Sequence, residues 1–162
     1  LFRGNVETRL NKVARGEVDG TLLAMAGLKR LGLADRVTEA LDAGVFPPAV
    51  GQAAIGIVTR AGDARTNALV AGIVCPETGI AVTAERALLK ALDGSCRMPI
   101  AGHATVFDGR VALRGLVLTP DGRHAFEERD EAAAGDASGL GKRLGEKIRA
   151  RLPADFFEAL KG

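Results

Sequence analysis

The segment IAGHATVFDGRVALRGLVL, residues 100–118, decides how the second half of the chain folds. Two stretches of alternating pattern flank the pair Asp108-Gly109. An Asp-Gly pair in that place is a strong hairpin signal, because both residues tolerate positive φ. The pattern therefore predicts strands over residues 100–107 and 110–118. One face of the second strand should be buried, since its residues are apolar or small: Val111, Leu113, Gly115 and Val117.

The sequence beyond this hairpin predicts a third strand. Pro120-Asp121-Gly122 is a turn sequence, and residues 123–129 follow it as a strand. Three strands joined by short turns form an antiparallel meander, which needs a cover on one face. We therefore expect residues 76–162 to form a small α+β domain with a three-stranded antiparallel sheet covered by helices.

Two helices are predicted as that cover. Apolar residues at helical spacing predict a helix over residues 80–92, with Thr78 as a candidate cap. A second helix and an apolar anchor near the C-terminus are indicated by the following residues: Leu140, Leu144, Ile148, Phe156 and Phe157.

The first part of the chain reads as an incomplete α/β unit. Asn5 is a candidate N-cap for a helix over residues 6–14. An apolar run at residues 21–25 has the length of a strand, and a short helix is expected over residues 34–41. Alternating strand and helix suggests a partly parallel sheet, but residues 1–43 offer too few strands to complete one.

A linker and a return segment are expected between these parts. The stretch GVFPPAVGQ, residues 44–52, contains two prolines and flanking glycines, which is typical of a linker. A β-rich run follows at residues 53–59, and Asp63 is placed to cap a helix over residues 64–73.

Composition excludes several classes of protein. The 162 residues are 47% hydrophobic and 26% charged, which fits a folded domain with a sizeable core. The net charge of +2 and the lack of Trp and Tyr argue against nucleic acid as a partner. No apolar run approaches the ~18 residues of a membrane span. Because residue 1 is Leu rather than Met, we expect a processed chain or a fragment.

Known motifs for metal and nucleotide chemistry are absent from the sequence. Its two cysteines and two histidines match no zinc spacing, so no metal site is expected. The sequence contains no GxxxxGK[ST], GxGxxG, HExxH or GxSxG motif. The cysteine content fits a reducing cytosol.

The local sequence leaves the candidate reactive residues open. Cys96 lies in GSCRMP, residues 94–99, where Arg97 favours a thiolate; the alternative is an inert buried cysteine. Cys75 is expected to be structural. Arg3 and Arg9 flank a helix start, where an anion can bind; the alternative, and the default on local sequence, is a solvated cationic helix end. Lys29 and Arg30 follow the predicted strand at residues 21–25, where a ligand can bind beyond the end of a strand; a surface charge pair is the default alternative. His103 and His124 are expected to be ordinary strand residues.

Four segments, taken together, resemble the porphobilinogen deaminase family. They are RGNVETRL (residues 3–10), AMAGLKRLGL (24–33), PAVGQAAIGI (48–57) and TAERALLKALDGSCRMPIAG (83–102). Ser95 and Ala53 stand where the family more often has glycine.

The resemblance implies a hydroxymethylbilane synthase. This activity joins four porphobilinogen units head to tail, releases ammonia, and frees the linear tetrapyrrole with water. The implied cofactor is a dipyrromethane held as a thioether on Cys96. Arg3, Arg9 and Arg30 match family arginines that bind the acetate and propionate groups of the cofactor and of the growing oligopyrrole chain. A cytoplasmic enzyme of heme and porphyrin biosynthesis is expected.

The resemblance also assigns domains. Residues 1–43 correspond to the latter part of a periplasmic-binding-protein-like α/β domain, the second of three. Residues 44–75 correspond to a hinge and a return to the first domain, and residues 76–162 to the third domain. No aspartate here matches the family's catalytic aspartate, which lies in an N-terminal half that this chain lacks. The alternative is therefore a catalytically incompetent fragment that only binds carboxylates, other anions or a partner.

Overall fold

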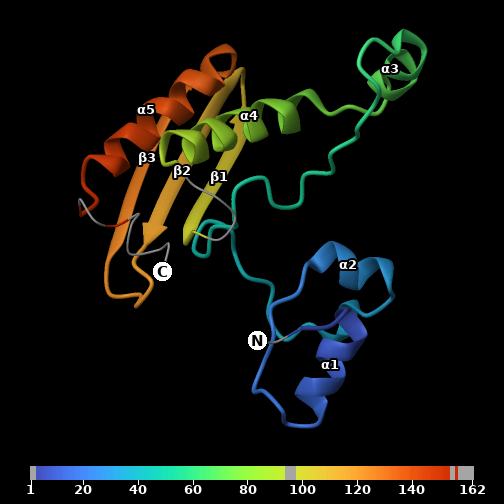
Figure 1. The fold of residues 1–162 in the computed structure, drawn as a ribbon. Coiled ribbons are helices and arrows are strands. Elements are labelled where there is room, and N and C mark those ends of the chain that lie inside the picture. Colours follow the sequence, from blue (N-terminus) through green and yellow to red (C-terminus); the bar gives the residue numbers. More distant parts are fainter. Residues whose placement is uncertain (1–2, 94–97, 154–155, 157–162) are drawn as a thin grey trace. The chain divides into compact units, whose positions relative to one another are not determined.

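The computed structural model describes residues 3–93, 98–153 and 156. The chain divides into two compact units, Leu1–Asp42 and Ala43–Gly162, which are described separately (Figure 1). The first contains α1 (Val6–Ala14), α2 (Met25–Arg30) and the 3₁₀ turn η1 (Ala34–Arg36). The second contains α3 (Ala64–Ala71), α4 (Pro76–Ala91), β1 (Ile100–Phe107), β2 (Arg110–Leu118), β3 (Ala125–Ala133), the 3₁₀ turn η2 (Ala134–Asp136) and α5 (Ala137–Arg149).

The second unit is built on a three-stranded antiparallel sheet in the order β1-β2-β3. The first two strands have the bounds that the sequence predicts. Their turn contains Asp108 at φ 46° and Gly109 at φ 71°, as a tight hairpin with right-handed twist requires. The meander prediction is confirmed.

The predicted third strand is shifted along the chain, since β3 runs over Ala125–Ala133 and not over residues 123–129. The two residues before β3 are hydrogen-bonded to the turn that precedes them. Arg123 N donates to Asp121 Oδ1 at 3.1 Å, and His124 N donates to Thr119 Oγ1 at 3.0 Å. His124 therefore lies in the turn, and the expectation of a strand residue there is wrong. At its other end β3 continues as far as β2 offers a partner, so that Ala133 pairs with Arg110.

Helices α4 and α5 cover one face of the sheet (Figure 1). The alternation predicted for β2 is observed, because its apolar positions are buried and the intervening positions are not. Each fully buried Leu or Ile contributes on the order of 1.5–3 kcal/mol of transfer free energy. The largest fully buried side chains come from both layers: Leu88, Leu92, Val111, Leu113, Val117, Leu140, Leu144 and Ile148. Phe156 joins this core as predicted, whereas Phe157 lies outside the described residues.

The helix α4 begins one turn earlier than predicted. Cys75 is its N-cap residue, Pro76 is in its first turn, and Thr78 lies inside the helix, so the predicted Thr78 cap is wrong. Proline at the first helical position sacrifices no hydrogen bond, because that N–H has no intrahelical acceptor. The same Cys-Pro pair thus separates α3 from α4 and starts the second of them.

The first unit contains helices and no strand among its described residues. The Asn5 cap is confirmed, since its side chain accepts a hydrogen bond from Thr8 N at 2.8 Å. The strand predicted at residues 21–25 is wrong: residues 21–24 belong to no strand, and α2 begins at Met25. The helix predicted over residues 34–41 is a single 3₁₀ turn, η1.

The segment predicted as a β-rich return also lacks strand pairing. Residues 54–60 belong to no strand, although Asp63 caps α3 by accepting from Thr66 N at 3.0 Å, as predicted. Ile55 and Val58 are 87% and 95% exposed. An apolar segment with no neighbouring strand forms no ladder hydrogen bonds, so sequence preference alone does not make it a strand.

Candidate functional site

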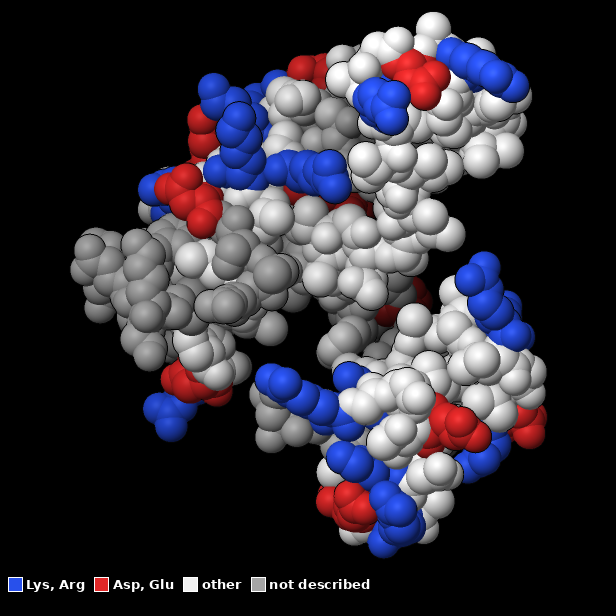
Figure 2. Space-filling model, turned by 45° about the vertical axis from the view of Figure 1, so that its right-hand side comes forward, with Lys and Arg blue, Asp and Glu red and all other residues white. Residues whose placement is uncertain are grey.

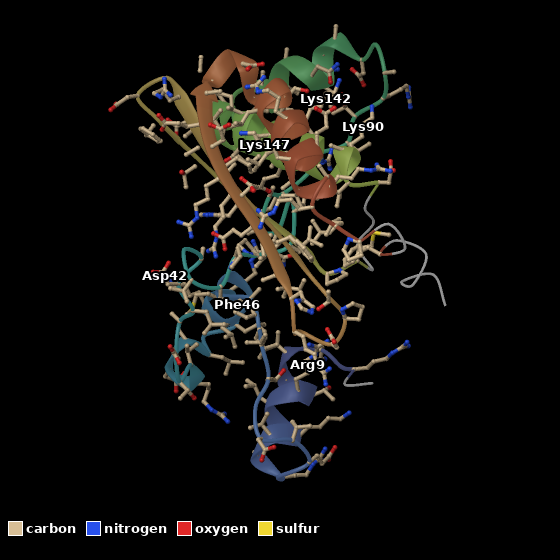
Figure 3. The ribbon with its side chains drawn as sticks, turned by 90° about the vertical axis from the view of Figure 1, so that its left-hand side faces the viewer. Arg9, Asp42, Phe46, Lys90, Lys142 and Lys147 are labelled. Atoms are coloured by element: carbon tan, nitrogen blue, oxygen red, sulfur yellow. The ribbon has the colours of Figure 1, made fainter. Side chains whose placement is uncertain are left out.

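The start of α1 places two of the predicted anion-binding residues at one helix end. Arg3 precedes the N-cap and is exposed, and Arg9 lies just beyond the first turn (Figure 3). Arg9 Nε donates to Gly4 O at 3.0 Å, which holds the guanidinium beside the turn. Gly4 has φ 137°, and a Cβ built on it would lie 2.8 Å from Thr8 Cγ2, so a side chain there would clash. A helix N-terminus flanked by two guanidinium groups suits a carboxylate.

Arg30 belongs to a different helix of the same unit. It is exposed in the last turn of α2, next to the exposed Lys29. At a helix C-terminus both cations also offset the negative end of the helix dipole. The structure therefore brings Arg3 and Arg9 together at α1 and presents Arg30 from α2.

Cys96, the predicted attachment point of the cofactor, lies outside the described residues. The segments on either side of it contribute residues to the core. The last residues before it include the buried Leu92 and then Asp93, which forms an ion pair with Arg149 of α5. Ile100, where β1 begins, is also buried. The sequence around Cys96 thus connects a core helix with a core strand.

The second cysteine, which is expected to be structural, lies at the N-cap of a helix. Cys75 is exposed at the start of α4. The Thr78 hydroxyl, followed by the Thr78 backbone N–H, lowers the pKa of the Cys75 thiol. An exposed thiol with a lowered pKa is more reactive than an ordinary buried cysteine.

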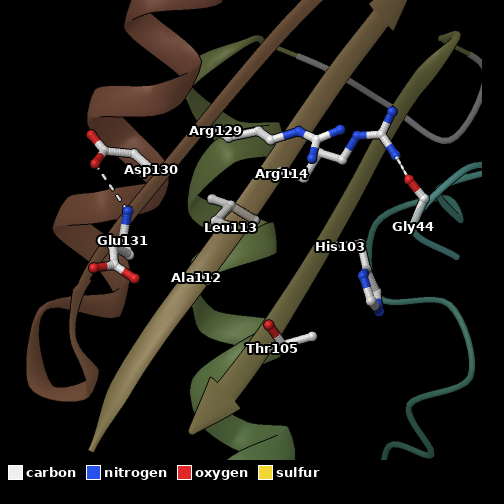
Figure 4. Close-up of a pocket in the computed structure, with 9 residues that line it drawn as sticks. All are labelled: Gly44, His103, Thr105, Ala112, Leu113, Arg114, Arg129, Asp130 and Glu131. Carbon is white, nitrogen blue, oxygen red and sulfur yellow. Dashed lines mark hydrogen bonds between the residues drawn. The ribbon is translucent and has the colours of Figure 1, made fainter.

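The helix-free face of the sheet carries a polar cluster that sequence reasoning missed. His103, Arg114 and Arg129 are direct cross-strand neighbours, because His103 pairs with Arg114 and Arg114 with Arg129. They line a hollow of about 400 Å³ (Figure 4). The other lining residues are Gly44, Thr105, Ala112, Leu113, Asp130 and Glu131. The sequence signal that could have revealed this cluster is the polar residue type at strand positions that alternate with the buried ones.

Two guanidinium groups in this cluster share one carboxylate. Arg114 NH2 and Arg129 Nε each lie 2.7 Å from a Glu127 oxygen. The hydrogen bond from Arg114 lowers the pKa of Glu127 by more than its partial burial raises it. Arg114 also donates to the Gly44 carbonyl, while its Nε is buried without a hydrogen-bond partner. Asp130 and Glu131 also line the hollow, so the cluster offers guanidinium donors without an excess of positive charge.

The outer face of the helical layer is also basic, but its charges are mostly paired. Figures 2 and 3 show basic side chains over this layer, with acidic side chains beside them. Lys142 lies 3.9 Å from Glu146, and Lys147 lies 3.1 Å from Asp130. Exposed ion pairs of this kind contribute little to stability, and each pair neutralises its own charge. This face is a weaker candidate for an anion site than the start of α1 or the cluster around Arg114 and Arg129.

A buried carboxylate lies between the sheet and the predicted linker. Glu85 of α4 is 7% exposed and accepts hydrogen bonds from Gly51 N at 2.8 Å and from Ala104 N at 2.9 Å. Residues 44–52 were expected to be a linker. Instead, Ala49 forms a β-bridge with Ala101, so part of this segment belongs to the second unit.

The described part of the chain contains no clear candidate for a metal site or for a single membrane-spanning helix. No group of three or more His, Cys, Asp or Glu side chains there is arranged to hold a metal ion. No single helix there is long and apolar enough to cross a membrane; only α3 and α4 together, bent by 105°, have the length and composition.

Comparison with known proteins assigns the family. Residues 1–68 match the family model "Porphobilinogen deaminase, dipyromethane cofactor binding domain", and residues 80–150 match "Porphobilinogen deaminase, C-terminal domain". The two matches follow each other along one chain and together cover most of it. The chain belongs to the porphobilinogen deaminase family, a family of transferases in tetrapyrrole synthesis that use a dipyrromethane cofactor.

Two relatives show how much of a family member this chain spans. It is 50% identical to the porphobilinogen deaminase of Nitrobacter winogradskyi over 161 residues, which are 99% of this chain and 51% of that protein. It is 49% identical to the porphobilinogen deaminase of Nitrobacter hamburgensis over 162 residues, which are 100% of this chain and 51% of that protein. The chain thus spans about half the length of the curated relatives it matches.

Proposed function

We propose that this chain takes part in the hydroxymethylbilane synthase reaction as the C-terminal portion of the enzyme. In that reaction four porphobilinogen units are joined head to tail with loss of ammonia, and the linear product is released with water. The observation that carries the proposal is the match of both parts of the chain, in order, to two domains of one family.

The arginines of the first unit would bind the carboxylates of cofactor and substrate. Each porphobilinogen carries two carboxylates, so a growing chain accumulates negative charge that must be neutralised. Arg3 and Arg30 are exposed, and Arg9 is held at the α1 turn by Gly4 O. Guanidinium groups bind carboxylates in a bidentate manner, which fixes the orientation of a pyrrole as well as its charge. These residues fit a carboxylate-bearing dipyrromethane.

Cys96 would hold the dipyrromethane as a thioether. When bound there, the cofactor supplies the pyrrole terminus from which the chain grows. A thiolate is the nucleophilic form of cysteine, and Arg97, next in sequence, favours it. A thioether is a poor leaving group, so attachment at Cys96 would persist through turnover.

We also propose the domain arrangement that the resemblance implies. Residues 1–43 would complete a periplasmic-binding-protein-like α/β domain, and residues 53–73 would return to the first domain. The exposure of Ile55 and Val58 supports this, because a cluster of exposed apolar side chains indicates a surface that another part of the protein covers. Residues 76–162 would form the third domain, which carries Cys96 in its sequence.

The chain by itself should be inactive. No aspartate here matches the family's catalytic aspartate, and electrostatic and acid–base assistance is worth orders of magnitude in rate. The remainder of the enzyme would then be its essential partner. We propose a cytoplasmic location, because a free cysteine nucleophile requires a reducing compartment.

A second candidate function is anion or partner binding without catalysis. It is favoured by the Arg114–Arg129 cluster, where two cations share one carboxylate beside an open hollow.

Mass spectrometry on the full-length protein distinguishes the two. The enzyme proposal expects a mass increase on a peptide containing Cys96, a positive pyrrole colour reaction, and an unmodified Cys75. An unmodified Cys96 in protein supplied with porphobilinogen would favour the binding module. Hydroxymethylbilane formed by the 162-residue chain alone would show that its catalytic groups have been misassigned.

A further inference from the structure

Residues 44–51, which we call the strap, run beside β1 in the second unit. β1 is an edge strand, so some of its backbone N–H groups have no partner within the sheet. The strap supplies one partner: Gly102 N donates to Pro48 O at 3.0 Å. Ala49 forms its bridge with Ala101 at the same place. The strap thus extends the sheet by a short antiparallel contact.

At the C-terminal end of the strap, Glu85 joins the strap to β1. One carboxylate oxygen accepts from Ala104 N of β1, and the other accepts from Gly51 N of the strap. Hydrogen bonds to an ionised acceptor are roughly twice as strong as neutral ones. A carboxylate as buried as Glu85 would be costly without these donors. One side chain of α4 therefore holds two separate stretches of backbone.

Packing adds to this attachment. A Cβ built on Gly102 would lie 3.0 Å from Val50 Cγ2 and 3.1 Å from Leu88 Cδ2. Gly102 therefore leaves the space in which Val50 of the strap approaches the core leucine. Val50 is partly buried against the hydrophobic core, so the strap is also an apolar part of the domain.

Arg114 holds the opposite end of the strap. Its guanidinium donates to Gly44 O while it is fixed by the ion pair with Glu127. Its side chain is 15% exposed and lies on the helix-free face, whereas Glu85 approaches from α4 on the other face. The strap is therefore anchored at both ends and from both faces of the sheet.

We propose that Glu85, with Arg114, is a positioning residue that makes the strap part of the Cys96-bearing domain. The strap would then move together with that domain. This inference rests on the proposed function, in which arginines of one unit and the cysteine of the other act on one growing chain. A loosened strap would leave substrate binding intact and slow the later elongation steps, because the two units would meet the chain in a wider range of arrangements.

Amide hydrogen exchange on the 162-residue chain tests the attachment directly. In the wild type, the amides of Gly51 and Ala104 should be protected. Glu85→Gln keeps the size of the side chain but has a single acceptor oxygen, so one of these two amides should exchange about tenfold faster. The core amide of Val117 should not change. The exposed Glu146→Gln on α5 is the matched control and should leave all three amides unaltered.

Arg114→Gln tests the other anchor and does not depend on the folding of the Glu85 variant. The Gly102 amide, which donates to the strap, should exchange several-fold faster, while the Leu113 amide of β2 keeps its protection. An unprotected Gly51 amide in the wild type would overturn the proposal. Unchanged exchange at Gly51 and Ala104 in Glu85→Gln, or at Gly102 in Arg114→Gln, would also overturn it.

Turnover by the full-length enzyme then tests the consequence. Glu85→Gln should lower kcat several-fold with little change in KM, and enzyme bound to partly elongated chains should accumulate. An equal rate and an equal distribution of bound chains would reject the positioning role. If the wild type makes no tetrapyrrole, the proposed function fails, while the exchange results still decide whether the strap is attached.

Discussion

Gly141 of α5 lies against Leu88 of α4 so closely that a Cβ built on the glycine would stand 2.9 Å from the Leu88 backbone nitrogen. One turn later, a Cβ on Gly145 would lie 2.6 Å from Ala91 Cβ. Side chains essentially never approach at such distances, so the two helices touch backbone to backbone through these glycines. This close contact places the three fully buried apolar residues of α5 over the sheet: Leu140, Leu144 and Ile148.

Gly141→Ala should therefore destabilise the second unit. The added methyl group meets the α4 backbone, and overpacking of this kind costs about 1–3 kcal/mol. Gly79→Ala in α4 is the control, because nothing lies within 4 Å of its Cβ position. It should be neutral or stabilise by about 0.5–1 kcal/mol through helix propensity. Urea unfolding of both variants measures the difference, and equal stability of the two would refute the close-packing argument.

The Glu127 ion pairs should make stability depend on pH. The pKa of Glu127 is lower in the folded protein than in the unfolded chain, first because Arg114 donates a hydrogen bond to it. Its contribution is therefore fully present above the unfolded pKa and is lost as the pH falls through the folded pKa. Glu127→Gln should cost about 1 kcal/mol at neutral pH, and this cost should shrink toward pH 3. Urea unfolding at a series of pH values measures it; a difference that stays constant would contradict the assignment.

The arginine assignment predicts a loss of chain assembly in the full-length enzyme. Replacing Arg3, Arg9 or Arg30 by Leu leaves a ligand carboxylate unpaired, which costs on the order of 2–5 kcal/mol of binding. Lys in place of Arg should also impair assembly, because an ammonium cannot make the bidentate contact. Thermal stability should change little. The exposed Arg65→Leu on α3 serves as control, and normal turnover in all three Leu variants would remove the binding role.

The two cysteines should behave differently when each is replaced by serine. Cys96→Ser should abolish the covalent mass increase, since a hydroxyl is a much weaker nucleophile at neutral pH. Cys75→Ser should leave the cofactor in place and change stability by less than about 0.5 kcal/mol, because Cys75 is exposed. Intact-protein mass spectrometry before and after treatment with porphobilinogen reads out both variants. A cofactor lost with Cys75 and retained without Cys96 would reverse the assignment.

The sequence by itself determined the elements whose signals lie within a few consecutive residues. Asp108-Gly109 sets the bounds of β1 and β2, because the turn needs two residues that accept positive φ. Asn5 and Asp63 fix the starts of two helices, since each side chain accepts from an N–H three residues on. The four family-like segments likewise carried the family assignment without any structure.

Only the tertiary structure decided the features that depend on distant partners. Residues 21–25 and 53–59 have strand-like composition, yet neither is a strand, because a strand exists only where another strand supplies its hydrogen bonds. The strap has the sequence of a linker, and only the structure shows that Glu85, 34 positions beyond Gly51, supplies the acceptor that holds it. Arg114 and Arg129 share Glu127 only because the strand register sets them side by side. Local turns and caps depend on neighbouring residues. Strand pairing, the Glu85 hydrogen bonds and the Glu127 ion pairs form only when chain closure brings remote donors and acceptors together.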